Sequence, residues 1–108
     1  MKKENRILKY QEFSEIINTT KRIRTKHFLI NFRNNNENKA RVGVSVSKRN
    51  GNAVTRNKIK RQVRYIIGKS LDMSRQVDIV IVARATYDIL DFENNKLELT
   101  EALTNLGE

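Results

Sequence analysis

The sequence predicts one α+β domain whose elements follow the order αβββαβα. Three observations lead to this prediction. The chain has 108 residues, a length typical of a single domain spanning residues 1–108. Apolar residues recur at helical spacing in three segments, and they alternate or run continuously in the segments between them. The chain has no proline, and no repeat or low-complexity tract divides it into parts.

The N-terminal part of the chain contains a predicted helix followed by a strand. KYQEFSEIINTT has its apolar side chains at helical spacing, which predicts a short helix over about residues 10–18. KHFLINFR alternates and places Phe28, Ile30 and Phe32 on one face, as a strand does. The Asn-rich segment NFRNNNENKAR predicts a hairpin loop around Asn34–Asn38.

The strand RVGVSVS has two different faces. Its three valines point to one side and predict a core face, whereas Gly43, Ser45 and Ser47 leave the other side nearly bare. VDIVIVARA is a run of β-branched residues, typical of a strand that is buried on both faces. DFENNKLELTEALTNLGE predicts a loosely amphipathic helix that ends near Gly107. Its apolar positions are Leu97, Leu99, Leu103 and Leu106.

Seven Lys and Arg residues and no acid lie between Lys48 and Ile67, in KRNGNAVTRNKIKRQVRYII. NGN supplies a turn, after which a helix begins near Ala53 to Thr55 and ends at Gly68. One side of this helix is an apolar stripe of Ile59, Val63, Ile66 and Ile67. Beside the stripe, an arc of about 100° contains Asn57, Lys60, Arg61 and Arg64. The helix joins two strands as a βαβ unit, for which a right-handed crossover is the general rule.

Charge is distributed unevenly along the chain, whose formal net charge is +10. Residues 1–76 hold 20 Lys/Arg and 5 Asp/Glu, whereas residues 77–108 hold 2 and 7. A solubilising surface usually mixes both signs. The acid-free run therefore favours a polyanion as partner, nucleic acid before an anionic membrane. The alternative is an ordinary amphipathic helix with solvated lysines, but four of the seven cations are arginines.

Several classes of protein are excluded or disfavoured by composition. The chain has no cysteine, which excludes disulfides and thiolate metal sites. No apolar run approaches the roughly 18 residues of a membrane span. The N-terminal MKKENRILKYQEF lacks the apolar region of a signal peptide. We therefore expect a cytoplasmic protein.

The sequence offers no convincing catalytic group. Its one histidine, His27, stands next to a predicted strand, where a structural role is the commoner one. Asp88, Asp91 and Glu93 lie close together, but their spacing matches no metal motif and suits the start of a helix. No Gly-rich phosphate loop is present. We expect no catalytic residue and no metal site in this chain.

RVGVSVSKRNGNAVTRNKIKRQVR, from Arg41 to Arg64, resembles the signature of the bacterial ribonuclease P protein component. That family combines a Val/Gly/Ser strand, a Lys-rich turn with Gly-Asn-Ala-Val and an Arg-Asn-Arg/Lys helix. ENRILKYQEF and DIVIVARATYDILDFENNKLELTEAL resemble the family's N-terminal segment and its last strand and helix. The resemblance implies an α/β sandwich with a four-stranded sheet and a left-handed βαβ crossover through the basic helix.

The resemblance also implies a function. The family's protein sits on a catalytic RNA, and the holoenzyme, an endoribonuclease, removes the 5′ leader from precursor tRNA. The RNA supplies the active site and binds the Mg²⁺ ions, so this chain is an RNA-binding subunit, with no membrane and no obligate protein partner. The positions that match RNA-binding residues of the family are Lys48, Arg49, Arg56, Asn57, Lys58, Lys60, Arg61 and Arg64.

A leader-binding cleft between the sheet and the basic helix is a further implication of the resemblance. Its positions are matched by Phe13, Ser45, Ser47 and Arg84. Small side chains let an extended backbone lie close, and Phe13 offers a base-stacking surface; the other interpretation of Phe13 is a core residue. The sequence departs from the family at three positions that weaken the cleft: Ile17 and Asn31 replace aromatics, and Ala85 replaces a basic residue.

Two other functions compete with this interpretation. A ribosomal or RNA-chaperone protein of similar fold would bind RNA without processing it. A metal nuclease acting alone is disfavoured because no carboxylate cluster is evident.

Overall fold

The computed structural model describes residues 1–18 and 21–106, and it confirms the predicted order of elements. Its helices are α1 (Tyr10–Ile17), α2 (Ala53–Ser70) and α3 (Phe92–Thr104). Its strands are β1 (Arg22–Arg24), β2 (Phe28–Asn34), β3 (Arg41–Val46) and β4 (Val77–Ala83). Two short 3-10 turns, η1 (Lys3–Asn5) and η2 (Lys48–Asn50), precede α1 and α2.

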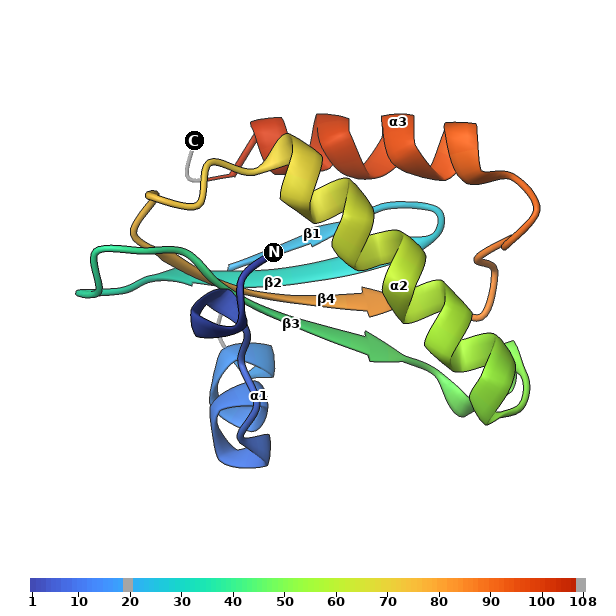
Figure 1. Ribbon diagram of the computed structural model, residues 1–108, viewed down its shortest axis with the longest axis horizontal. Helices are drawn as coiled ribbons and strands as arrows, with labels where there is room; N and C mark the ends of the chain where they lie inside the picture. The colour runs from blue at the N-terminus through green and yellow to red at the C-terminus, as the bar shows by residue number, and fades with distance from the viewer. Residues whose placement is uncertain (19–20, 107–108) are drawn as a thin grey trace.

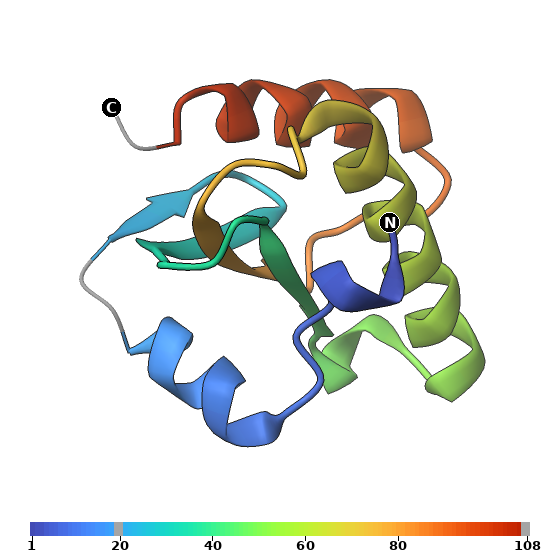
Figure 2. The ribbon, with the colours of Figure 1, turned by 60° about the vertical axis from the view of Figure 1, so that its left-hand side comes forward.

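The four strands form one sheet that separates two layers of helix. α2 and α3 lie on one face of the sheet and α1 lies on the other (Figures 1 and 2). The main core fills the α2/α3 side, where the predicted stripe of α2 is at most 2% exposed. A smaller cluster of Ile7, Ile16 and Val80 lies under α1. The sheet is therefore covered on both faces, but unequally.

β4 occupies a central position because it is apolar on both faces. The strand order is β1-β2-β4-β3, with β4 antiparallel to β2 and parallel to β3. Ile79 and Ile81 join the main core, and Val80 joins the cluster under α1. The predicted hairpin around Asn34–Asn38 is wrong, since β4 lies between β2 and β3. A strand that must be covered on both sides is better placed inside the sheet than at its edge.

The crossover from β3 through α2 to β4 is left-handed, as the family resemblance implies and against the general rule. In Figure 1 both strands point to the right, β3 lies nearer the viewer than β4, and α2 covers the upper face. The hand of the crossover depends on which face of the sheet α2 covers and on which side of β3 the next strand pairs. Val42 and Val44 of β3 point into the main core and so decide which face α2 covers. β4 pairs on the side of β3 that faces β2.

Two predictions about the helices need correction. Gly68 does not end α2, which continues to Ser70; a Cβ at Gly68 would lie at an ordinary contact distance of 3.5 Å from the Met1 amine. Leu97 is 67% exposed, so the apolar side of α3 consists of Leu99, Ala102 and Leu103. The predicted end at Gly107 lies outside the described residues. β1 has the sequence RIR, which is too short to show an alternating pattern.

Candidate nucleic-acid interface

The turn before α2 is held in one conformation by its own side chains. Gly51 has φ 124°, a backbone conformation that favours glycine. Asn52 caps the helix, because its side-chain oxygen accepts a hydrogen bond from Thr55 N at 3.0 Å. The Asn50 side chain donates to the carbonyl of Arg84 at 3.0 Å and so ties the turn to the end of β4. The two cations of the turn, Lys48 and Arg49, are exposed.

The basic residues of η2 and α2 have no acidic neighbours in the sequence and make up the candidate interface. We define the cationic face as Lys48, Arg49, Arg56, Asn57, Lys58, Lys60, Arg61 and Arg64. Arg61 and Lys58 are exposed, whereas Arg56 is half-buried and its guanidinium donates to the Gly51 carbonyl at 3.4 Å. Among the described residues, no acid forms an ion pair with any member of this face. The face therefore presents its positive charge to solvent rather than to the rest of the fold.

The N-terminal segment adds a residue that the sequence analysis missed. Arg6 lines a hollow of about 410 Å³ together with Asn57, Arg61 and Arg64. No local signal marks Arg6, because the basic N-terminus contains four Lys or Arg residues within its first ten positions and only the fold brings one of them to α2.

The proposed leader-binding residues lie on a different face from the one predicted. Phe13 of α1 covers Gly43 so closely that a Cβ there would lie 2.5 Å from the ring tip. Ser45 shares this face with Gly43, because side chains two apart on a strand point the same way. α2 covers the opposite face, so the predicted cleft between the sheet and the basic helix is wrong. The alternation of β3 explains this, since its valines face α2 and its small residues face α1.

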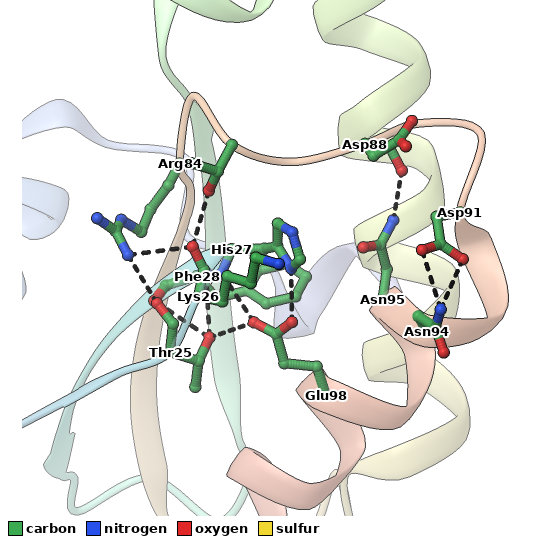
Figure 3. A network of polar contacts seen from close by, with 11 residues as sticks. Thr25, Lys26, His27, Phe28, Arg84, Asp88, Asp91, Asn94, Asn95 and Glu98 are labelled. Carbon is green, nitrogen blue, oxygen red and sulfur yellow. Dashed lines mark hydrogen bonds and ion pairs between the residues drawn. The ribbon is translucent and has the colours of Figure 1, made fainter.

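Ser47 and Arg84 lie where β3 and β4 end, and both have structural partners. The Ser47 hydroxyl accepts from Arg49 N at 3.2 Å. The Arg84 guanidinium donates to the carbonyls of Thr25 and Lys26 at 2.8 and 3.1 Å (Figure 3). Of the four predicted cleft residues, Phe13 and Ser45 therefore come together on the α1 face, and the other two support the loops at its end.

The three departures from the family have distinct environments. Asn31 is fully buried on the α1 face, and its side-chain oxygen accepts from Arg22 Nε at 2.9 Å. Ile17 is half-buried against the cluster under α1. Ala85 is exposed after β4. The aromatic positions of the family are thus used here for packing and for a polar contact.

A buried ion network fixes the other end of the α1 face. Asp78, only 1% exposed, accepts from Arg41 at 3.0 Å, from Arg33 at 3.1 Å and from Asn35 at 2.7 Å. Arg41 also pairs with Glu12 of α1 at 2.6 Å. Burial opposes ionisation of Asp78, but these three hydrogen bonds outweigh burial and lower its pKa. The network holds α1 against the sheet.

His27 has a structural environment, as the sequence analysis favoured. Its Nδ1 lies 2.6 Å from one oxygen of Glu98 (Figure 3). The other oxygen of Glu98 accepts from His27 N at 2.8 Å and from the Thr25 hydroxyl at 2.5 Å. Burial raises and hydrogen bonding lowers the pKa of Glu98, and the net direction is downward. This cluster fastens the β1–β2 turn to α3.

The carboxylates of Asp88 and Asp91, in the loop before α3, accept hydrogen bonds from residues close to them in the sequence. Both oxygens of Asp91 accept from the Asn94 amide, and Asp88 accepts from Leu90 N at 2.9 Å. Asn95 donates to the Asp88 carbonyl at 2.7 Å (Figure 3).

Across residues 1–18 and 21–106, no group of three His, Cys, Asp or Glu residues could hold a metal ion. Within the same residues, no helix is long and apolar enough to cross a membrane.

Comparison with known proteins decides between the competing interpretations. A family model described as Ribonuclease P matches residues 1–107. The chain belongs to the ribonuclease P protein family. The ribonuclease P protein component of Mesoplasma florum is 41% identical over 94% of this chain and 94% of its own length. That of Streptococcus gordonii is 36% identical over 95% of this chain and 87% of its own length.

Solved structures of the family have the same fold. The Thermotoga maritima RNase P protein superposes with a TM-score of 0.80 at 26% identity, covering 95% of this chain and 98% of the other. The Staphylococcus aureus RNase P protein gives 0.76 at 32% identity, covering 96% and 98%. Membership of this family supports a protein component of ribonuclease P, and with it a role in tRNA processing, over a ribosomal or RNA-chaperone protein. The family's protein is one part of an RNA-processing holoenzyme.

Proposed function

We propose that the cationic face of α2 binds the catalytic RNA subunit of ribonuclease P. The observation that carries this proposal is the absence of acid partners for this face among the described residues, although the described chain contains acids that pair elsewhere. Arginine offers planar, bidentate contacts to phosphates. Hydrogen bonds of Asn50 and Asn52 hold the turn that precedes α2, so the backbone of Lys48 and Arg49 is already in place beside the helix.

The α1 face is proposed to receive the 5′ leader of precursor tRNA. Phe13 is half-buried, with its ring on Gly43, and it retains exposed surface for stacking. Ser45 beside it is small enough for an extended strand to approach. The catalytic RNA and the leader thus bind opposite sides of the sheet, which lets one small protein hold both at once.

The catalytic groups and the Mg²⁺ ions are proposed to belong to the RNA. In the described chain His27 and the acids at 88 and 91 are engaged in hydrogen bonds that fasten loops. A polycation between two polyanions screens their repulsion, a task that Mg²⁺ shares. The protein therefore acts, in the cytoplasm and without another protein partner, by tightening substrate binding and lowering the Mg²⁺ that cleavage requires.

The test is single-turnover cleavage of precursor tRNA across a Mg²⁺ titration, with the catalytic RNA, the protein, or both. We expect no cleavage by the protein alone, a lower Mg²⁺ requirement with both, and little change in the rate at saturating Mg²⁺. No stimulation of the RNA would favour an RNA-binding protein without a processing role. A large effect on the saturated rate that His27→Ala or Asp91→Ala removes would place catalytic groups in the protein and contradict the proposal.

A further inference from the structure

Three arginines from two distant parts of the sequence converge on one hollow. Arg6 lies on the N-terminal segment, and Arg61 and Arg64 lie three residues apart on α2, just under one turn. Together with Asn57 they line a hollow of about 410 Å³. None of the three forms an ion pair with a described residue. Every side chain that lines the hollow is a hydrogen-bond donor, and none is an acid.

Arg6 is held in place by its neighbours on both sides. Asn5 is 4% exposed, and its side chain donates to the Ala40 carbonyl at 2.7 Å. Ile7 is also 4% exposed, and its N–H donates to the Val42 carbonyl at 2.9 Å. The backbone of Arg6 itself forms a parallel bridge with Val42 of β3. The N-terminal segment is thus fastened beside β3, and this fixes the backbone of Arg6 next to the hollow on α2.

This arrangement is unfavourable in the protein alone. Burial, followed by the nearby charge of Arg6, lowers the pKa of Arg64. Like charges gathered on rigid elements destabilise a fold unless an anion neutralises them. Nevertheless, the buried contacts of Asn5 and Ile7 hold Arg6 beside this helix. Such a preorganised set of donors suits a ligand with several acceptor oxygens and negative charge.

We propose that Arg6, Arg61 and Arg64 together bind one phosphate group of the catalytic RNA, with Asn57 as an additional hydrogen-bond donor. Guanidinium groups match the geometry of phosphate oxygens and form short, charge-assisted hydrogen bonds. The inference rests on the proposed function of the cationic face, and it extends that face to the N-terminal segment. The catalytic RNA is the source of the phosphate because the hollow adjoins the cationic face and lies across the sheet from Phe13.

The affinity of each variant for the catalytic RNA alone, measured by filter binding over a range of salt concentrations, tests the proposal. Arg6→Ala should bind about five- to tenfold more weakly and lower the log–log salt slope by roughly 0.7–0.9. Arg24→Ala is the charge-matched control, since Arg24 is exposed on β1 at the far edge of the sheet. Lys9→Ala controls for charge within the N-terminal segment. Both controls should change the affinity by less than twofold.

A double-mutant cycle distinguishes one shared phosphate from two separate contacts. Arg6→Ala with Arg61→Ala should lose less affinity than the product of the single losses, because both residues hold the same group. The melting temperature provides the structural control. Arg6→Ala should melt at or above the wild-type temperature, since it removes repulsion from Arg64, and inorganic phosphate at constant ionic strength should stabilise the wild type more than this variant.

The possible failures are separable. If Arg6→Ala binds like wild type while Arg61→Ala is weakened, the inference is wrong and the proposed function stands. If neither is weakened, both are wrong. If Arg6→Ala affects only capture of precursor tRNA by the holoenzyme, the phosphate belongs to the tRNA and the assignment is overturned. Should Arg6→Ala melt early, Arg6→Lys decides, because wild-type affinity in that variant would exclude bidentate binding by the guanidinium.

Discussion

On the α1 face of the sheet, Arg33 and Arg41 donate to the buried carboxylate of Asp78, whereas on the α2 face Arg61 and Arg64 have no acid partner in the described chain. The same residue type therefore serves two purposes within one small domain. Paired arginines hold α1 to the sheet and can be tested by their effect on stability. Unpaired arginines add little to stability and are available to an external polyanion. Mutations on the two faces should accordingly change different measurements.

The largest effect is expected at Asp78. Asp78→Asn leaves the side chains of Arg33 and Arg41 without their buried counter-charge and should reduce the free energy of unfolding by about 3 kcal/mol. Urea denaturation followed by circular dichroism measures this loss. Glu37→Gln, in an exposed loop, should leave the midpoint unchanged. Equal stability of both variants would mean that α1 is not held by this network.

Gly43→Ala should break the contact between α1 and β3. The added methyl group lies 2.5 Å from the ring tip of Phe13, so the ring must move. We expect a loss of about 1–3 kcal/mol, typical of overpacking. In a Phe13→Ala background the same substitution should have almost no effect on the melting temperature. A penalty that persists in that background would show that backbone strain, rather than the ring, is responsible.

Phe13→Ala tests the two interpretations of this ring. If it stacks on a leader base, the affinity of the holoenzyme for precursor tRNA should fall by about 1–3 kcal/mol, while mature tRNA and the catalytic RNA bind as before. Tyr65→Ala, which removes an aromatic of α2 that is 53% exposed, should not alter the ratio of precursor to mature affinity. Equal losses for both tRNAs, or unfolding of the variant, would identify Phe13 as a core residue only.

Lowering the pH should weaken the contact between the β1–β2 turn and α3. The pKa of Glu98 is lower in the folded chain than in the unfolded one. Its contribution is therefore complete above the ordinary carboxyl pKa of about 4.3 and is lost as the pH falls toward the folded value. Glu98→Gln should be about 1–2 kcal/mol less stable at pH 7. Its unfolding free energy should also decline less steeply than that of wild type between about pH 5 and pH 3.

The smallest effect on stability, and a clear one on binding, is expected at Arg61. Arg61→Ala should retain the wild-type melting temperature, because the side chain is exposed and unpaired in the described structure. Its affinity for the catalytic RNA should fall by about 1 kcal/mol, with a salt slope lower by roughly 0.7–0.9. Unchanged affinity and slope, with a native circular dichroism spectrum, would contradict RNA binding by this face.

Local sequence patterns determined most of the secondary structure of this protein. The stripe of α2, the alternation of β3 and the doubly apolar β4 are all visible in short windows, because burial on one face repeats with the period of the element. The cationic residues of α2 were predictable for the same reason. β1 was not assigned to residues, since three residues carry no period.

Only the tertiary structure decided how these elements face one another. β4 enters the sheet between β2 and β3, which excludes the predicted hairpin, and the face that α2 covers then gives the crossover its left hand. The side of the sheet that α1 covers determines that Phe13 meets Gly43 rather than α2. The hollow that Arg6 lines with Arg61 and Arg64 brings together residues more than fifty positions apart. None of these contacts leaves a periodic trace in the sequence, because each depends on which surfaces are buried together after the chain has folded.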